Sequence, residues 1–318
     1  MKKVLITGIT GMIGKHLAQI LQQDGHQVAG LSRATSSQRY ESGTVHYKHY
    51  QGDILDSRFL REVWKDWSPD LVYHLAAQAY NGESWKAEET TYLLNIKGSR
   101  NVFECCRELS PMARLIPACS SAAYGMVPQE MQPINEDSTP LRPISPYGVS
   151  KASMEMMARQ FHLNYKMDVV LPRLFIHVGP DHPPVTALQN FARQLASIKL
   201  GRQEAVLKVG NLGSSRDFVD VRDGARALVL LGEAGESGQT YNLCSGKAWT
   251  MQECLDRLIE ISGVQVQVGT DPKLIRFSDE KVLLGNPAKL NRLGWKTEIP
   301  FDRTLRDIFQ NWMERLEP

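Results

Sequence analysis

The fold is decided by one stretch near the start of the chain, Lys3-Val4-Leu5-Ile6-Thr7-Gly8-Ile9-Thr10-Gly11-Met12-Ile13-Gly14. Its first five residues form a short, largely apolar run of the kind that is buried in a parallel sheet. Three glycines follow, and a helical pattern then runs to about Gln23. Glycines let backbone N–H groups approach a pyrophosphate, and the start of the helix adds partial positive charge. This order predicts a dinucleotide site; the alternative is a plain tight turn.

Length and charge limit what the rest of the chain can be. With 318 residues, the chain is long enough for two lobes rather than one. Lys and Arg number 37 and Asp and Glu 35, which gives a net charge of only +2 without blocks of like charge. We therefore expect neither a nucleic-acid surface nor a membrane surface, and no apolar run approaches the length of a membrane span.

The cysteines indicate the compartment. Five are present, two of them are adjacent, and no C-x-x-C spacing occurs. Such a pattern favours neither a disulfide framework nor a zinc site, so we expect no metal. A reducing cytoplasm fits this pattern best.

The second predicted strand, His26–Leu31, ends at the residues that choose between two cofactors. An acidic side chain there would bind the ribose 2′-OH of NAD, whereas an arginine accommodates the 2′-phosphate of NADP. The chain reads Leu31-Ser32-Arg33, so a hydroxyl and a guanidinium stand where a carboxylate would be needed. This favours NADP(H) as the cofactor. The alternative is that Arg33 is only a solvated loop residue.

Catalytic chemistry is suggested by Ser145-Pro146-Tyr147-Gly148-Val149-Ser150-Lys151. Ser145 can cap a helix, and Pro146 suits the first helical position. Tyr147 and Lys151 then share one helical face, and a fixed ammonium lowers the pKa of a nearby phenol. The pair is a candidate proton donor and acceptor near neutral pH, although an ordinary surface pair has the same spacing.

The G-x-x-G-x-x-G turn, together with Tyr147 and Lys151, resembles the extended branch of the short-chain dehydrogenase/reductase superfamily, which acts on nucleotide sugars. The resemblance implies Ser120, Tyr147 and Lys151 as the catalytic set. It makes His74 a packed core residue and gives Asn95 a structural role. The cofactor contacts that we expect are Thr7, Gly8, Gly11, Met12, Ile13, Gly14, Ser32, Arg33, Asp53, Ile54, Leu75, Ala76, Ala77, Tyr147, Lys151 and His177.

One position excludes a reaction of this branch. Sugar 4,6-dehydratases place an acidic residue two positions before the Tyr-Gly pair, and this chain has Ala122 there. Alanine cannot transfer a proton, so the sequence disfavours dehydration. Ketone reduction and 4-epimerisation remain.

Several later segments resemble the GDP-4-keto-6-deoxy-D-mannose reductase subfamily, among them Lys208–Leu212 and Arg216–Asp223. In Arg173–Pro180, Ile176 replaces the asparagine that contacts the sugar or its phosphate in relatives. Guanidinium groups suit phosphate oxygens. The substrate contacts that the resemblance implies are Ser121, Asn190, Arg193, Lys208, Val209, Arg216, Arg276 and Asp279.

We therefore predict an α/β protein with a doubly wound parallel sheet (Rossmann) and a smaller α/β substrate-binding lobe. Residues 1–172 would form the NADP-binding domain, its sheet completed near 217–243, and 173–318 mainly the substrate lobe. The expected reaction is NADPH-dependent reduction of GDP-4-keto-6-deoxy-D-mannose to GDP-D-rhamnose, in a homodimer. Open alternatives are a 4-epimerase with retained NAD, a reductase of a related keto-sugar nucleotide, and a non-catalytic NADP-binding regulator.

Overall fold

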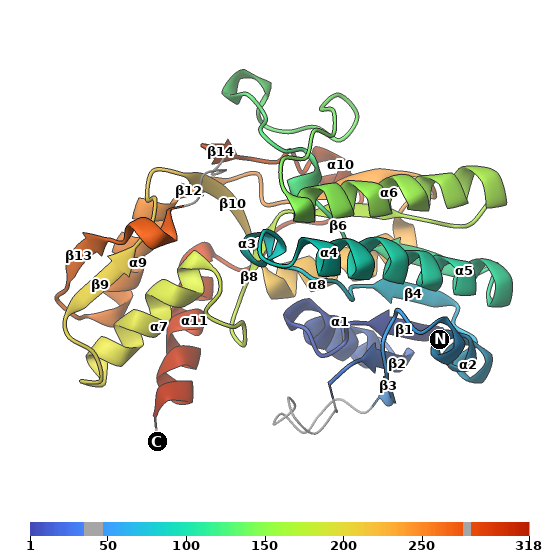
Figure 1. Ribbon diagram of the computed structural model, residues 1–318, viewed down its shortest axis with the longest axis horizontal. Helices are drawn as coiled ribbons and strands as arrows, with labels where there is room; N and C mark the ends of the chain where they lie inside the picture. The colour runs from blue at the N-terminus through green and yellow to red at the C-terminus, as the bar shows by residue number, and fades with distance from the viewer. Residues whose placement is uncertain (35–46, 276–280, 318) are drawn as a thin grey trace.

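The computed structural model describes residues 1–34, 47–275 and 281–317 as two lobes, and it confirms the α/β fold class (Figure 1). The larger lobe holds most of the first half of the chain, and the smaller lobe gathers α7, α9 and α11 beside it. None of the described helices combines the length and the apolar character that a bilayer crossing requires.

A parallel sheet forms the centre of the larger lobe. Its strands follow the order β3-β2-β1-β4-β5, so the chain winds outward from β1 in both directions. A single bridge between Leu115 and Val169 leads to a second group of parallel strands, β11-β7-β6. The strands are β1 (Lys3–Thr7), β2 (Gln27–Ser32), β3 (Lys48–Gln51), β4 (Leu71–His74), β5 (Arg114–Pro117), β6 (Cys119–Ser120), β7 (Leu171–Leu174) and β11 (Thr240–Leu243).

Helices cover both faces of this sheet, as the doubly wound prediction requires. On one face, α1 and α8 pack over Ile6 and Tyr73, and on the other, α2, α5 and α6 pack over Leu5 and Val72. These side chains alternate between faces because successive strand residues point in opposite directions. The helices are α1 (Met12–Gln23), α2 (Ser57–Trp67), α3 (Asn81–Ser84), α4 (Glu88–Tyr92), the π-helix η2 (Leu93–Gly98), α5 (Ser99–Leu109), α6 (Pro146–Tyr165), α8 (Val221–Ala234) and α10 (Ala288–Asn291), with 3₁₀ turns η3 (Ser121–Ala123) and η4 (Gln129–Met131).

The smaller lobe has its own core of Leu195, Leu255 and Trp312 among other apolar side chains. Much of this core comes from α9 (Met251–Ser262) and α11 (Phe301–Leu316). A capping box between Thr250 and Glu253 fixes the start of α9. The remaining elements are α7 (Ala187–Lys199), β8 (Ile176–Val178), β9 (Val206–Val209), β10 (Ser215–Asp220), β12 (Ala248–Thr250), β13 (Gln267–Thr270), β14 (Val282–Leu283) and the 3₁₀ turn η5 (Pro272–Leu274).

The segment from Val169 to Pro180 is divided between two sheets. β7 pairs with β6 and β11, whereas β8 pairs with β10 in a different sheet. The break falls at Phe175, whose buried side chain packs in a separate cluster with Tyr124, Ile134, Cys244 and Leu283. Because α8 and β11 pack on the larger lobe, we propose the two-lobe division with these later segments assigned to the first lobe.

Candidate active site

A cavity of about 1110 Å³ lies where β1 and β4 end side by side. The chain leaves these two neighbouring strands in opposite directions, which is where open α/β sheets bind ligands. The cavity brings together segments that are far apart in the sequence. Its lining includes Gly8, Gly11, Met12, Ile13, Gly14, Leu75, Ala77, Ser120, Ser121, Tyr147, Lys151 and His177 from the predicted set.

The glycine turn at the floor of this cavity suits an anionic group. Gly8 has a φ of 75°, and a Cβ there would lie 2.8 Å from the Ala76 backbone nitrogen. A Cβ on Gly14 would lie 2.6 Å from the Gly8 carbonyl oxygen, so α1 can approach β1 this closely only without a side chain. No side chain caps α1 at Gly11, and its first turn carries no acidic residue. Its free N–H groups therefore fit the pyrophosphate of a dinucleotide.

The opposite wall is set by the start of α6. Ser145 caps the helix, with the Gly148 N–H donating to Ser145 Oγ at 3.1 Å, and Pro146 occupies the first turn, as predicted. A Cβ on Gly148 would lie 2.5 Å from the Ala122 carbonyl oxygen. The helix therefore begins in direct contact with the turn after Ser120, and this contact positions Tyr147.

Tyr147, Ser120 and Lys151 form one polar cluster in the cavity. The Tyr147 hydroxyl and Ser120 share a hydrogen bond. Lys151 Nζ donates to the Ala118 carbonyl at 2.8 Å and lies 5.9 Å from the centre of the Tyr147 ring. The three side chains that the sequence selected are therefore brought together.

The pKa of Tyr147 differs from the expectation. Burial raises it above the usual value for a phenol, and the hydrogen bond with Ser120 only partly opposes that rise. Burial also lowers the pKa of Lys151 to about 8. The predicted lowering of the tyrosine pKa is wrong for the protein without ligand, because the cost of burying a phenolate outweighs the distant ammonium. Tyr147 is therefore a protonated phenol at neutral pH.

Asn95 has the structural role that we expected. It lies in η2, and its Nδ2 donates to Ser150 Oγ at 2.9 Å and to the Gln78 carbonyl at 3.0 Å. Ser150 Oγ in turn donates to the Tyr147 carbonyl at 2.7 Å. This chain of hydrogen bonds fixes the first turn of α6 against the loop that follows β4.

A buried ion pair supports the site from behind. Arg173 on β7 donates to both carboxylate oxygens of Glu155 at 2.6 and 2.9 Å, and to the Tyr124 hydroxyl at 2.7 Å. Glu155 follows Tyr147 and Lys151 along the same face of α6, so the pair ties the catalytic helix to the sheet.

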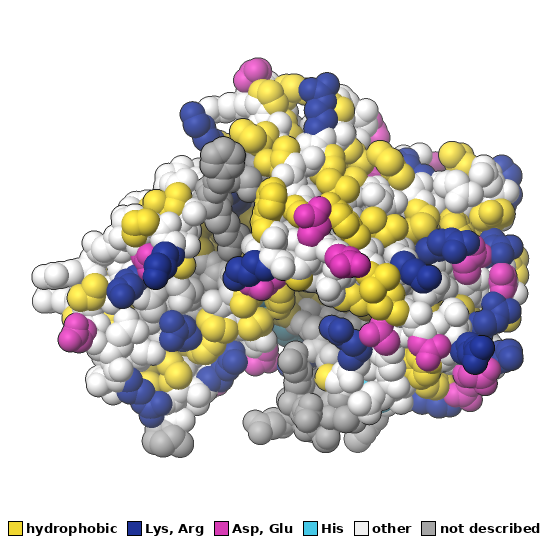
Figure 2. Space-filling model, viewed as in Figure 1, with side chains coloured by type: hydrophobic (Ala, Val, Ile, Leu, Met, Phe, Trp, Pro, Cys, Tyr) yellow, Lys and Arg dark blue, Asp and Glu magenta, His cyan; other side chains and the backbone are white. Residues whose placement is uncertain are grey.

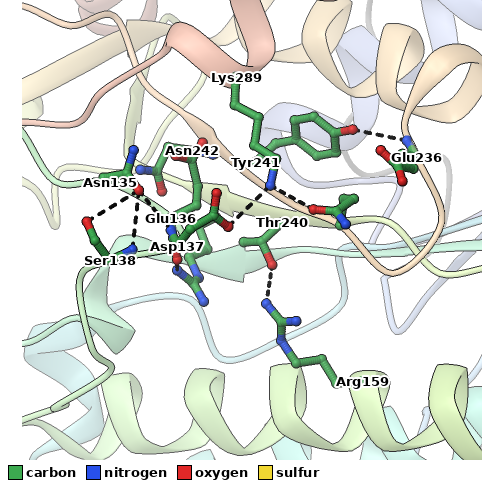
Figure 3. Close-up of polar contacts among 12 residues, drawn as sticks. Asn135, Glu136, Asp137, Ser138, Arg159, Glu236, Thr240, Tyr241, Asn242 and Lys289 are labelled. Carbon is green, nitrogen blue, oxygen red and sulfur yellow. Dashed lines mark hydrogen bonds and ion pairs between the residues drawn. The ribbon is translucent and has the colours of Figure 1, made fainter.

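The same network extends to β11. Tyr124 donates to Asn242 Oδ1 at 2.7 Å, and the Asn242 N–H donates to Glu136 Oε1 at 2.7 Å. Figure 3 shows Glu136 and Asn242 facing each other, with Thr240 reaching Arg159 on α6. Hydrogen bonds between Tyr124 and residues of β7 and β11 thus hold the turn that follows Ser120.

Several predicted cofactor residues do not line the cavity. The Thr7 hydroxyl is used by His74 at 2.7 Å and by the Ala76 N–H at 3.2 Å. Ser32 Oγ donates to the Ala34 carbonyl and meets His49 Nε2, while Ile54 is packed in the core. Arg33 is exposed at the end of β2, and Asp53 Oδ1 accepts the Leu55 N–H at 2.9 Å in the turn before α2, whose N-cap is Asp56.

Only some of the predicted substrate-binding residues line the cavity. Ser121 and Arg216 line the cavity. Asn190 and Arg193 bond to each other on α7, Lys208 is exposed on β9, and the side chain of Val209 is buried in the core of the smaller lobe. Arg276 and Asp279 lie outside the described residues.

His74 and His177, the two histidines considered in the sequence, have different surroundings. His74 is buried between Thr7 and Ser99 Oγ, and burial lowers its pKa to about 3, which confirms a neutral core residue. His177 lines the cavity, and its Nδ1 meets the Phe175 carbonyl at 2.9 Å. Burial lowers the pKa of His177 to about 4, so it too is neutral.

The lining also includes residues that the sequence analysis did not select, among them the polar side chains of Lys15, Asn81 and Arg315. Lys15 follows Gly14 directly. A cation in the first turn of the helix after the glycine turn could have been recognised from the sequence as a residue of the site. Asn81 starts α3 beyond β4, and Arg315 lies near the far end of α11, where only the tertiary structure brings it to the cavity.

Comparisons with known proteins agree with this geometry. The family described as GDP-mannose 4,6 dehydratase matches residues 5–308. The chain is 30% identical to GDP-6-deoxy-D-mannose reductase of Pseudomonas aeruginosa, over 99% of this chain and 98% of the relative. It is 28% identical to GDP-mannose 4,6-dehydratase of Yersinia enterocolitica, over 97% of this chain and 93% of the relative.

Solved structures of similar proteins share the fold of this chain. The structure of RMD from Pseudomonas aeruginosa complexed with NADPH superimposes with a TM-score of 0.87 at 30% identity, covering 99% of this chain and 100% of the other. UDP-glucose 4-epimerase of Thermus thermophilus in complex with NAD gives a TM-score of 0.86 at 27% identity, covering 97% and 98%.

Proposed function

Because this chain belongs to the GDP-mannose 4,6-dehydratase family within the extended short-chain dehydrogenases/reductases, we propose that it uses NADPH to reduce the 4-keto group of a GDP-6-deoxy-4-keto-hexose, giving GDP-D-rhamnose. The observation that carries this proposal is the make-up of one cavity. It holds the glycine turn together with Ser120, Tyr147 and Lys151, and it has Ala122 in its wall.

The polar groups of the cavity suit a reduction. A reduction needs a proton donor beside the carbonyl, and the Tyr147 hydroxyl, hydrogen-bonded with Ser120, can be that donor. Epimerisation would begin with the opposite step, in which a phenolate removes a proton from a sugar hydroxyl. Ala122 offers no acid for the elimination of water, which supports a reductase over a dehydratase.

Each residue then has one task. Ser120 donates a hydrogen bond to the C4 carbonyl oxygen, and Tyr147 protonates that oxygen as it becomes a hydroxyl. The Lys151 ammonium stabilises negative charge as the phenol gives up its proton. The glycine turn and the start of α1 would hold the pyrophosphate of NADPH. When bound, NADPH supplies the hydride that the C4 carbon accepts.

The direct experiment uses freshly made GDP-4-keto-6-deoxymannose. We expect the protein to consume about one NADPH for each sugar reduced, with GDP-D-rhamnose identified by NMR. Turnover without added reductant, from NAD retained through purification, would instead support the 4-epimerase. Binding of NADPH without turnover of GDP-, UDP- or CDP-linked keto-sugars would support the non-catalytic regulator.

Arg33 is expected to determine the preference for NADPH. The Ser32 hydroxyl is already engaged by His49 and the Ala34 carbonyl, so the exposed Arg33 guanidinium is the group left to bind a 2′-phosphate. Arg33→Ala should raise the KM for NADPH by about tenfold or more, because a hydrogen bond to a charged group is lost. The KM for NADH, measured in the same assay, should stay unchanged.

The control for this prediction is Arg202→Ala, which removes an exposed guanidinium from the smaller lobe. That variant should bind both cofactors as the unchanged protein does. If Arg33→Ala loses NADH and NADPH affinity equally, Arg33 does not recognise the 2′-phosphate.

We also propose a homodimer. Figure 2 shows apolar side chains gathered along the face of α4, η2 and α6, where Leu93, Val149 and Met156 are exposed. Glu89 precedes this patch and Arg100 follows it, so a two-fold axis would bring opposite charges together.

Light scattering after gel filtration should give a dimer mass, and Leu93→Glu should give a monomer. A monomer from the unchanged protein would refute the proposal.

A further inference from the structure

Among the described residues that line the cavity, Asn81 and His177 each have a buried side-chain atom without a hydrogen-bond partner. The Asn81 side-chain oxygen, Oδ1, is buried and accepts no hydrogen bond from the described residues. The residue itself is held in place, because Ser84 Oγ donates to the Asn81 carbonyl at 2.7 Å. A buried amide oxygen without a partner costs about 1–3 kcal/mol, and native proteins rarely keep one without a reason.

The side-chain amides of nearby residues, unlike that of Asn81, have hydrogen-bond partners at both ends. Gln78 bonds to Tyr80 through both ends of its side chain, at 2.8 and 3.0 Å. Asn95 bonds to Gln78 and Ser150 through both of its ends. The loop after β4 therefore provides hydrogen-bond partners for the side-chain amides of Gln78 and Asn95. The side-chain oxygen of Asn81, where the loop borders the cavity, has none among the described residues.

The surroundings of Asn81 are those of the reaction site. The same cavity is lined by Ser120 and Tyr147, and by Ile176 at the start of β8. The Ile176 side chain has no hydrogen-bonding group, whereas Asn81 adds a side-chain amide to the same cavity.

We propose that Asn81 is a specificity-determining residue whose side-chain amide hydrogen-bonds a hydroxyl of the sugar ring. This inference rests on the proposed function and names a further contact for it. A sugar hydroxyl both donates and accepts, and a carboxamide offers one acceptor and two donors. A half turn about the last side-chain torsion exchanges the oxygen and nitrogen, so either atom can face the ligand.

The test replaces the amide by an apolar group of similar size. Asn81→Val should weaken binding of GDP-D-rhamnose by about tenfold, because a site that loses its partner for a ligand hydroxyl loses the hydrogen bond. Binding of GDP, which has no sugar ring beyond the ribose, and of NADPH should not change. The melting temperature of the protein without ligand should be equal or higher, since a buried unpaired polar group is removed.

Two further variants sharpen the result. Asn81→Val combined with Ile176→Asn returns an amide to the cavity and should recover part of the lost affinity. Asn164→Val removes an exposed amide near the end of α6 and should leave both affinities unchanged.

The outcomes separate this inference from the proposed function. Equal affinities of Asn81→Val and the unchanged protein for GDP-D-rhamnose would overturn the role of Asn81, and so would a parallel loss for GDP. If the unchanged protein binds GDP-D-rhamnose but reduces no keto-sugar, only the proposed reaction falls, and the binding comparison still decides the role of Asn81. A protein that does not bind GDP-D-rhamnose at all would overturn both.

Discussion

Tyr147→Phe is expected to lower the rate of keto-sugar reduction by about 10²–10⁴-fold, the range for loss of a positioned general acid. The phenol is held beside Ser120 and is protonated at neutral pH, so it is the group placed to protonate the carbonyl oxygen. Phenylalanine keeps the ring and its packing but lacks the hydroxyl group that supplies the proton. Steady-state kinetics with NADPH and the 4-keto substrate measures the loss.

NADPH affinity, followed by fluorescence titration, should be nearly unchanged in this variant. The glycine turn and the start of α1, which would hold the pyrophosphate, do not depend on the Tyr147 hydroxyl. Tyr165→Phe is the matched control, because Tyr165 is exposed at the other end of the same helix. Full turnover by Tyr147→Phe would refute the catalytic assignment.

Glu155→Ala is expected to lower the free energy of unfolding by about 3–5 kcal/mol, the usual cost of leaving a buried charge unpaired. Arg173 is 4% exposed and Glu155 is fully buried. Burial works against the Arg173 charge, but its hydrogen bonds with Glu155 outweigh that effect and hold the pKa of the guanidinium above its usual value. Without Glu155 the guanidinium would stay charged, and it would have no carboxylate partner.

Urea denaturation, which yields the free energy of unfolding, measures this effect. Glu62→Ala is the control, since Glu62 forms an ion pair with Lys65 on the exposed surface of α2. Exposed pairs contribute little, so that variant should unfold close to the unchanged protein. A Glu155→Ala protein with unchanged stability would mean that Arg173 finds another partner or water.

The local parts of the site follow from the sequence. The spacing of glycines after β1 and the Ser145-Pro146 start of α6 depend on contacts within a few residues, and both have the structure we predicted. The helices at 251–262 and 301–316 are equally local, because apolar spacing along one helix decides which face is buried.

Where the sequence does not decide the structure, a long-range contact intervenes. Residues 169–180 are one largely apolar run, but β7 pairs with β11 and β6, whereas β8 pairs with β10 in another sheet. Proximity to Lys151 suggested a lowered pKa for Tyr147, yet desolvation by the surrounding walls raises it. Asn190, Arg193 and Lys208 stay predicted substrate contacts, and α7 and β9 place them outside the cavity lining.

The sequence alone determined the α/β class, the glycine turn and the capped start of α6, since turns, caps and helical faces are fixed by neighbouring residues. Its family resemblance supplied Ser120, Tyr147 and Lys151 as the expected catalytic set. Only the tertiary structure decided that Glu155 neutralises Arg173 and that Asn81 and Ile176 border the same cavity. Those pairs are separated by many residues, and burial and electrostatic contact depend on distance in space.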